Sequence, residues 1–379
     1  MISRILKLLL ESRFGKALIV LGPRQTGKTT LLSELARERG DYLFLDADDP
    51  LVQEQLHRAN TAALRQIIGS FKLVFIDEAQ RIPNIGLTLK LITDQIPEVQ
   101  LMVSGSSALE LSNQINEPLT GRKWEYQLFP ISWEELSQHV GYLQSLQQLE
   151  TRLLFGMYPE VVTKIGDERP ILKQLSSSYL YKDLLSFAGI RKPELLEKLL
   201  QALAFQVGNE VSYHELGRLL GADKKTVSNY LDLLEKAFVI FRLPAFSRNL
   251  RNEISRGRKI YFYDNGIRNA LIANFAPLGL REDVGALWEN FLITERWKML
   301  HYREAFVNRF FWRTTAQQEV DYLEERDGRL YAYEFKWNPN KKGRFPKNFK
   351  ATYPKALTKT ITPDNFHSFL TQIEEPTVT

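Results

Sequence analysis

The chain has 379 residues, more than one compact core usually holds, so two or three domains are expected. Its 50 Lys and Arg against 45 Asp and Glu leave a net charge of +5, which is too small to indicate nucleic-acid binding by itself. The sequence has no cysteine, which excludes disulfides and thiolate metal sites. No apolar run approaches the roughly 20 residues that span a bilayer, so we expect a cytoplasmic protein with no membrane partner.

Five short apolar runs separated by helical patterns predict an α/β domain over residues 1–142. Runs that are apolar on both faces are typical of parallel strands covered by helices. The predicted strands are Ala17–Leu21, Tyr42–Leu45, Leu73–Ile76, Val99–Val103 and Trp124–Leu128.

The next two predicted parts are helical. Residues 143–193 have a helical pattern with polar spacers, which indicates a connector. Residues 194–258 predict a compact unit, in which Tyr213–Leu220 and Lys224–Lys236 form a helix, a turn and a second helix.

Residues 259–379 predict a second α/β domain. Its predicted helix is Asp283–Leu300. Asp327-Gly328 is typical of a tight hairpin turn between the last two strands. The predicted strands are Lys259–Tyr263, Phe306–Arg313, Glu319–Glu324 and Leu330–Lys336.

Residues Gly22–Thr29 match the phosphate-binding P-loop pattern, between a predicted strand and a helix that begins near Thr29. Glycines let backbone amides point at phosphates, and the start of a helix adds partial positive charge. We expect Lys28 to reach the β- and γ-phosphates of ATP and Thr29 to bind Mg²⁺. The predicted nucleotide-binding residues are Gly22, Pro23, Arg24, Gln25, Thr26, Gly27, Lys28, Thr29, Thr30 and Ser106.

Two acids follow the predicted strand Leu73–Ile76, where unpaired carboxylates are unfavourable unless a cation or a substrate uses them. Asp77 is expected to hold Mg²⁺ and Glu78 to polarise the attacking water. A capping or salt-bridge role for Glu78 is the alternative, and it implies ATP binding without appreciable turnover.

Two further features are candidates for contact with the γ-phosphate. Ser104–Ser107 place hydroxyl groups at the end of the fourth predicted strand, as a phosphate sensor or as helix caps. Arg122 and Arg24 are candidates for the catalytic arginine, facing the nucleotide of this subunit or of an adjacent one. For Arg122, an ordinary surface position is the alternative.

These motifs resemble prokaryotic AAA-type ATPases fused to a C-terminal domain of uncharacterised function. The resemblance extends to about Trp337 and implies an additional-strand P-loop fold and ATP hydrolysis, but no substrate. Met157 departs from the pattern, because the family often has a second glycine there. The matching stretches are Gly22–Thr29, Asp77–Pro83, Ser104–Ser107, Leu119–Arg122, Phe129–Pro130, Gly156–Glu160, Tyr181–Leu184 and Glu334–Lys336.

Two regions are candidates for contact with DNA. Val211–Leu243 is similar to a winged helix, whose second helix carries Lys224, Lys225, Ser228 and Asn229 toward phosphates and bases, or serves only for packing. Seven Lys and Arg and no acid lie between Asn338 and Lys359. They suit a phosphate backbone, or they form a solvated basic loop and helix. Trp337, Phe345, Phe349 and Tyr353 are interleaved with them as rings available for base stacking.

Asp321, Glu334 and Lys336 are expected to converge across the predicted hairpin, because residues two apart in a strand share a face. Glu289 on the preceding helix is a candidate third acid. The order of these elements is similar to the PD-(D/E)XK nuclease core, where such a cluster binds Mg²⁺ and activates water. An ordinary surface salt bridge is the alternative.

The leading hypothesis is a nucleotide-driven switch or motor that acts on DNA. The first alternative is an ATP-gated module whose nuclease-like domain is inactive and binds a protein partner. The second is an Mg²⁺-dependent nuclease regulated by the ATPase. The residues also permit a homo-oligomer.

Overall fold

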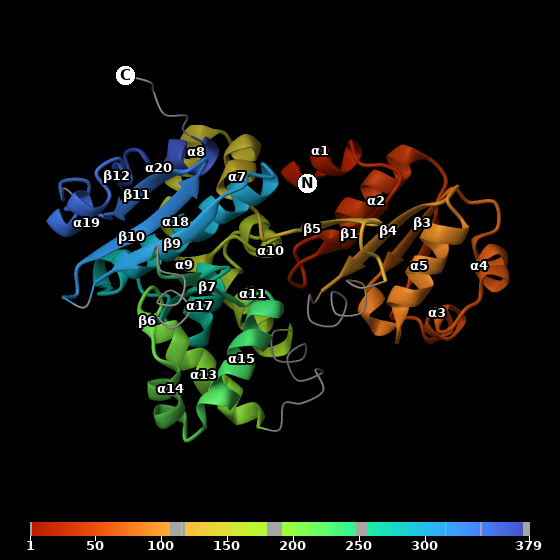
Figure 1. Cartoon of the computed structure of the whole chain (residues 1–379), viewed down its shortest axis with the longest axis horizontal. Helices are drawn as coiled ribbons and strands as arrows, with labels where there is room; N and C mark the ends of the chain where they lie inside the picture. Colours follow the sequence, from red (N-terminus) through yellow and green to blue (C-terminus); the bar gives the residue numbers. More distant parts are fainter. Residues whose placement is uncertain are drawn as a thin grey trace. The chain divides into compact units, whose positions relative to one another are not determined.

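A computed structural model describes residues 2–106, 115, 118–179, 192–247, 257–314, 316–341 and 343–373 (Figure 1). The chain forms two compact units. The first contains Met1–Ile131 and Lys236–Phe238, and the second contains Ser132–Glu235 and Val239–Thr379. This division is coarser than the four parts expected from the sequence, which stay a prediction.

The first unit is built on a five-stranded parallel sheet of order β2-β3-β4-β1-β5. All five predicted strands are confirmed, with bounds that differ by at most two residues. β4 lies between β3 and β1, as an additional-strand P-loop fold requires. The strands are β1 (Ala17–Leu21), β2 (Leu43–Asp46), β3 (Leu73–Asp77), β4 (Gln100–Gly105) and β5 (Lys123–Gln127).

Helices complete this unit, and α2 packs against β3 and β4. Asp49 and Asn60 cap α3 and α4 through their side chains, which accept hydrogen bonds from Leu51 N and Ala63 N. The described helices are α1 (Ile5–Glu11), α2 (Lys28–Arg39), α3 (Pro50–Leu56), α4 (Thr61–Ile68), the 3₁₀ turn η1 (Ala79–Arg81) and α5 (Ile85–Gln95).

The second unit begins at Ser132 with helices, the first of which, α7, precedes the predicted helical segment 143–193. In its described part, the buried residues Tyr158, Val161 and Leu172 pack with Ile267. The helices are α7 (Trp133–Val140), α8 (Tyr142–Gln147), α9 (Leu149–Phe155), α10 (Pro159–Thr163) and α11 (Glu168–Gln174), followed by the π-helical turn η2 (Leu175–Tyr179).

The predicted helix, turn and helix are confirmed as α14 and α15, with Gly221 in the left-handed conformation at the turn. A three-stranded antiparallel sheet of order β6-β8-β7 accompanies them. In chain order the elements are α13 (Pro193–Phe205), β6 (Glu210–Val211), α14 (Tyr213–Leu220), α15 (Lys224–Lys236), β7 (Ile240–Pro244) and β8 (Arg258–Phe262).

The rest of the second unit contains a four-stranded sheet of order β12-β11-β10-β9, in which only β11 and β12 are parallel. The hairpin at Asp327-Gly328 is confirmed, and both residues have positive φ. The elements are α17 (Asn265–Leu271), the 3₁₀ turn η3 (Leu278–Leu280), α18 (Val284–Tyr302), β9 (Asn308–Arg313), β10 (Glu319–Arg326), β11 (Arg329–Phe335), α19 (Lys347–Thr352), β12 (Leu357–Ile361) and α20 (Phe366–Thr371).

The aromatic rings of the basic segment belong to the core. Phe349 is fully buried, and Phe345 and Tyr353 pack against the same cluster. Trp337 makes an edge contact with Trp288 of α18. Phe349 is therefore not available to stack on bases, and the segment includes α19 and the start of β12.

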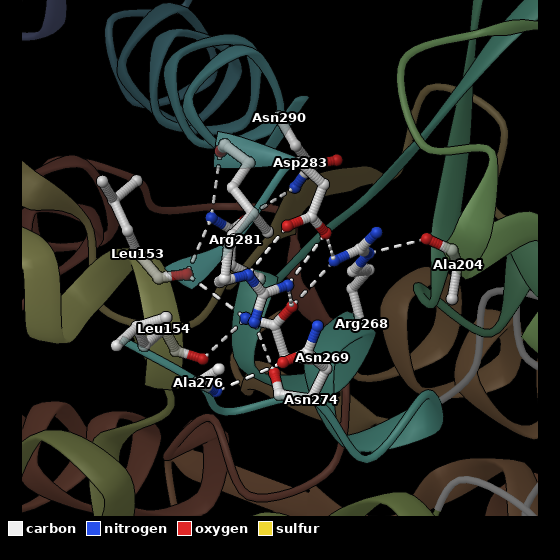
Figure 2. A network of polar contacts seen from close by, with 12 residues as sticks. Leu153, Leu154, Ala204, Arg268, Asn269, Asn274, Ala276, Arg281, Asp283 and Asn290 are labelled. Carbon is white, nitrogen blue, oxygen red and sulfur yellow. Dashed lines mark hydrogen bonds and ion pairs between the residues drawn. The ribbon is translucent and has the colours of Figure 1, made fainter. Parts of the chain in front are cut away.

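A buried polar network joins α9, α13, α17 and the start of α18 (Figure 2). The Asp283 carboxylate accepts hydrogen bonds from Arg268 and Arg281, and Arg268 also donates to the carbonyl of Ala204. Asn269 donates to the carbonyl of Leu154. The single carboxylate offsets one of the two positive charges, and carbonyl and amide oxygens accept further hydrogen bonds from both guanidinium groups, so neither arginine is an isolated ion.

Gly156 lies against a second buried acid. The Asp264 carboxylate caps α17 by accepting from Ile267 N and also accepts from Met157 N at 2.6 Å. A Cβ atom on Gly156 would lie 2.1 Å from Asp264 Oδ1, and the φ of Gly156 is +74°. The Gly156–Glu160 motif therefore forms a turn that only glycine can begin.

We expect Gly156→Ala to lower the free energy of unfolding more than Gly166→Ala does. Both glycines have positive φ, but a Cβ on Gly166 would meet nothing within 4 Å. The difference between the two variants measures the collision with Asp264, which costs about 1–3 kcal/mol. Urea unfolding followed by circular dichroism tests this, and equal losses in the two variants would contradict it.

Candidate nucleotide-binding site

The P-loop joins the end of β1 to the start of α2. Gly22 approaches β5 so closely that a Cβ atom would lie 2.2 Å from the carbonyl oxygen of Leu128. Gln25 and Gly27 also have positive φ, of 59° and 90°. The loop thus curls at the carboxyl edge of the sheet and leads directly into the helix N-terminus, the arrangement that binds phosphates.

Lys28 is buried and lies over this loop. Its ammonium group donates to the carbonyl oxygens of Gly22 at 3.0 Å and Pro23 at 2.8 Å. The Thr26 hydroxyl donates to the same Pro23 oxygen at 2.9 Å. The positive charge of Lys28 is therefore held within the loop, and its contact with phosphates stays a prediction.

Arg4 supports the loop, and sequence reasoning missed it. Its guanidinium group is buried and donates to the carbonyl oxygens of Thr26 and Phe129, each at 2.6 Å. It thereby ties the P-loop to the segment that follows β5. These contacts span 22 and 125 residues of sequence, so no local pattern marks them.

Asp77 ends β3 beside the P-loop. Its carboxylate accepts hydrogen bonds from the hydroxyl groups of Thr29, at 2.7 Å, and Ser104. Burial raises the pKa of Asp77 above its ordinary value, and these two hydrogen bonds oppose the rise. Mg²⁺ prefers oxygen ligands, and the Thr29 hydroxyl and the Asp77 carboxylate lie together here. These two side chains therefore fit its coordination.

Glu78 is half-buried and has a left-handed backbone, with φ of 51°. Its amide donates to Ser104 Oγ at 3.1 Å, and its carboxylate accepts from Gln80 Nε2 at 2.5 Å. Gln80 also donates to Ser106 Oγ at 2.9 Å. The structure thus brings Glu78 and Ser106 together through Gln80, a contact that the sequence did not predict. Ser107 lies outside the described residues.

The other residues predicted for this site differ in their exposure and in their distance from the P-loop. Gln25, Thr29 and Thr30 are exposed, and Arg24 is half-buried in the loop. Arg122 precedes β5, and its carbonyl oxygen accepts from Ala17 N at the start of β1.

Arg122 therefore lies at the opposite edge of the sheet from the P-loop. The five residues of β1 separate the two edges by roughly 17 Å, at about 3.3 Å per residue. The Arg122 side chain is bonded to Asp94 at 2.5 Å. The structure thus does not bring Arg122 to the phosphate site of its own chain.

In the second unit, Asp321, Glu334 and Lys336 converge as predicted. The Lys336 ammonium group lies 2.9 Å from Glu334 Oε2 and 3.7 Å from Asp321 Oδ2. Asp321 also accepts from the Phe335 amide at 2.8 Å. β10 and β11 position these three side chains at one end of the hairpin.

Glu289 of α18 belongs to the same cluster, together with a lysine that sequence reasoning missed. The buried Lys259 ammonium group lies 2.9 Å from Glu289 and 2.5 Å from Glu319. The Tyr261 hydroxyl donates to Glu289 at 2.6 Å. Burial opposes the charge of Lys259, but the surrounding carboxylates raise its pKa above the ordinary value.

Two acids of this cluster have raised pKa values. Burial and the Asp321 carboxylate raise the pKa of Glu334 to about 7. Burial also raises the pKa of Glu289. Among the described residues, no group of three or more His, Cys, Asp or Glu side chains is arranged to hold a metal ion. Two ammonium groups, those of Lys259 and Lys336, lie among the carboxylates of this cluster.

The predicted second helix of the winged-helix-like segment exposes Lys224, Lys225 and Asn229, with Ser228 half-buried. A groove of about 890 Å³ lies beside it. Its polar lining includes Lys224, Ser228, Arg242, Arg258 and Arg313.

Comparison with known families divides the chain into three matched regions. Residues 15–137 match the family model described as an AAA domain. Residues 146–281 and 284–368 match two models described as domains of unknown function, DUF8612 and DUF4143.

The stretch Tyr181–Leu184, part of the resemblance noted above, lies outside the described residues. No helix in the described part of the chain is long and apolar enough to cross a membrane.

The relatives among curated proteins are themselves uncharacterised. A protein of Mycobacterium tuberculosis is 27% identical over 323 residues, which cover 84% of this chain and 69% of the relative. A protein of Methanocaldococcus jannaschii is 25% identical over 336 residues, which cover 82% and 72%.

One solved structure, described as the Walker-type ATPase paby2304 of Pyrococcus abyssi, resembles this fold with a TM-score of 0.51 and 17% identity. The match covers 72% of this chain and 96% of that one. The AAA-domain match and this shared fold confirm the expected P-loop ATPase domain and support ATP binding and hydrolysis.

Proposed function

We propose that this protein is an Mg²⁺-dependent ATPase that acts as a nucleotide-driven switch or motor on DNA. The observation that supports it best is the convergence of Lys28, Thr29, Asp77 and Glu78 at the carboxyl edge of one parallel sheet. Ligands bind at this edge in open α/β sheets.

Each of these residues has a distinct role in the proposal. The P-loop amides and Lys28 bind the phosphates, and Thr29 and Asp77 hold Mg²⁺, which neutralises charge on the phosphate oxygens. Glu78 accepts the proton of the attacking water. A role for Arg122 in hydrolysis requires a second copy of the chain, because it lies away from its own P-loop.

Action on DNA is supported by the second unit. The chain order helix, strand, two helices and two strands is that of a winged helix, and α15 exposes two lysines. In the adjoining groove, Arg242 is paired with Asp232, and Arg313 with Glu210. Among the described lining residues, the remaining charged groups are Lys224, Arg258 and the acid Glu215, so the groove keeps only a small positive surplus for phosphates.

A second candidate is an ATP-gated interaction module with an inactive nuclease-like domain. Lys259 supports it, because its buried ammonium group already pairs with Glu289, a carboxylate that a nuclease would use for metal binding. The alternative of an active Mg²⁺-dependent nuclease is supported by the juxtaposition of Glu289, Asp321, Glu334 and Lys336. Intact plasmid after incubation with Mg²⁺ or Mn²⁺ favours the inactive domain.

For the ATPase, we expect Lys28→Ala to lose nucleotide affinity. Glu78→Gln is expected to keep binding but to lower kcat by about 10²–10⁴-fold, the usual contribution of a general base. Glu54→Gln, which changes an exposed acid on α3, is the control and should turn over normally. Phosphate release and calorimetry with Mg-nucleotide measure the two effects. Normal turnover by Glu78→Gln would remove this residue from its role.

For DNA, we expect the double variant Lys224→Ala with Lys225→Ala to weaken duplex binding. Each lysine that contacts a phosphate contributes about one to the slope of log affinity against log salt. Fluorescence anisotropy at several salt concentrations measures this slope, and ATP turnover should rise with DNA at low salt in the parent protein but not in the double variant. Lys198→Ala on α13 is the control, and an unchanged slope in the double variant contradicts the assignment to α15.

For the carboxylate cluster, we expect Glu334→Gln to stabilise the protein at pH 8.5 but not at pH 4.5. Because the pKa of Glu334 is raised to about 7, the folded state keeps a proton that the unfolded chain releases near pH 4.5. The stability of the parent protein therefore falls as pH rises through this window, by about 3 kcal/mol at most. Urea unfolding at both pH values measures the difference. The exposed Glu282→Gln is the control, and a pH-independent effect of Glu334→Gln contradicts the prediction.

A further inference from the structure

Gln80 contacts two residues of the proposed catalytic site, Glu78 and Ser106. It lies on η1, two residues after Glu78, and only 8% of its surface is exposed. Its amide nitrogen donates to Glu78 Oε2 at 2.5 Å and to Ser106 Oγ at 2.9 Å. One side chain thus joins the groups that follow β3 and β4.

The orientation of the Gln80 amide follows from its partners. An ionised carboxylate can only accept hydrogen bonds, so the nitrogen of Gln80, and not its oxygen, must face Glu78. The Gln80 Oε1 atom is then left buried, with no hydrogen-bond partner among the described residues.

A buried carbonyl oxygen without a donor is unfavourable by about 1–3 kcal/mol. Such groups are rare in folded proteins, and each calls for a ligand, a water or a catalytic role. The oxygen of Gln80 belongs to a side chain whose nitrogen is fixed on the proposed general base, so a donor that satisfies it lies close to Glu78.

We propose that Gln80 is a second catalytic residue, which positions the water that attacks the γ-phosphate. Its Oε1 accepts one hydrogen of this water while the Glu78 carboxylate accepts the other. The proposal rests on the ATP hydrolysis proposed above and adds a residue to it.

The step is balanced as follows. The water oxygen forms a bond to the γ-phosphorus, and the bond from that phosphorus to the β,γ-bridging oxygen breaks, so ADP leaves with the electron pair. The proton of the water passes to Glu78 and is then released to phosphate or solvent. Gln80 gains and loses no atoms, because its part is to orient the water, as positioned amides do in phosphoryl transfer.

The contact with Ser106 gives Gln80 a second partner at the end of β4. The same amide nitrogen therefore donates both to Glu78, the proposed base, and to the hydroxyl group of Ser106, the candidate γ-phosphate sensor. In this proposal, a shift of Ser106 on nucleotide binding would rotate the Gln80 amide and so move Oε1. Gln80 thus links recognition of the γ-phosphate to alignment of the water.

The first test is Gln80→Leu, which keeps a similar volume but removes both polar atoms. We expect kcat to fall by about 10–100-fold, because an orienting hydrogen bond is lost and Glu78 remains. The affinity for Mg-ADP should change by less than about twofold. Phosphate release and calorimetry with Mg-ADP measure both values.

The second test separates catalysis from structural support. Mg-ADP with aluminium fluoride imitates the transferring phosphoryl group with its in-line water, whereas beryllium fluoride imitates the bound γ-phosphate. Gln80→Leu should lose trapping of Mg-ADP by aluminium fluoride and keep trapping by beryllium fluoride. Loss of both analogues would mean that Gln80 only supports the fold of the site, and the proposal would be overturned.

Two further variants complete the design. Gln100→Leu removes an amide that donates to the Lys16 carbonyl at the opposite edge of the sheet, and it should leave kcat unchanged. Gln80→Glu keeps the size and an acceptor but loses the donor to Glu78, so its kcat should also fall. If Gln80→Leu has a normal kcat and Glu78→Gln is slow, the proposal for Gln80 is overturned and the ATPase function stands. Normal turnover in Glu78→Gln refutes the underlying function instead.

Discussion

The buried carboxylate of Asp77 is the interaction on which the nucleotide site depends. A carboxylate at the end of an apolar strand is unfavourable unless hydrogen bonds replace its lost water. Here the hydroxyl groups of Thr29 and Ser104 do so, one from α2 and one from β4. The pairing fixes the start of α2 and the ends of β3 and β4 in one place. The positions of Lys28 on the loop and Glu78 beyond the strand follow from it.

Local patterns were sufficient to predict this part of the fold. Strands that are apolar on both faces, such as Leu73–Asp77, have few alternatives to a parallel sheet, and the P-loop marks where the sheet binds phosphate. Contacts between distant residues were not predictable in the same way. Arg4 reaches Phe129 across 125 residues, and its helix has only an ordinary amphipathic pattern. Arg122 was placed near the nucleotide because a glycine and a strand adjoin it, but strand direction puts it at the other edge.

The motif Gly156–Glu160 illustrates the difference between a recurring sequence and a chemical site. Sequence resemblance singled it out, and the structure shows a packing reason for it. The Asp264 carboxylate occupies the space that a side chain at Gly156 would need, and it also binds the amide of Met157. A second glycine is not needed at Met157, because its amide and not its side chain makes the contact. The polar residues nearby hold helices together, as Asp283 does with its two arginines.

Charge balance distinguishes the two carboxylate sites of this chain. At Asp77 the partners are neutral hydroxyl groups, so the negative charge remains available to a cation. At Glu289 and Glu334 the partners are the ammonium groups of Lys259 and Lys336, which neutralise much of the charge within the protein. The strand pattern of the hairpin predicted the position of Lys336. Lys259 lies on β8, and no spacing in the sequence indicated that it would join this cluster. A divalent cation at the second site must compete with the ammonium groups of Lys259 and Lys336. At the first site it would neutralise the carboxylate of Asp77. Under the proposed function, this charge balance favours a divalent cation at the first site over the second.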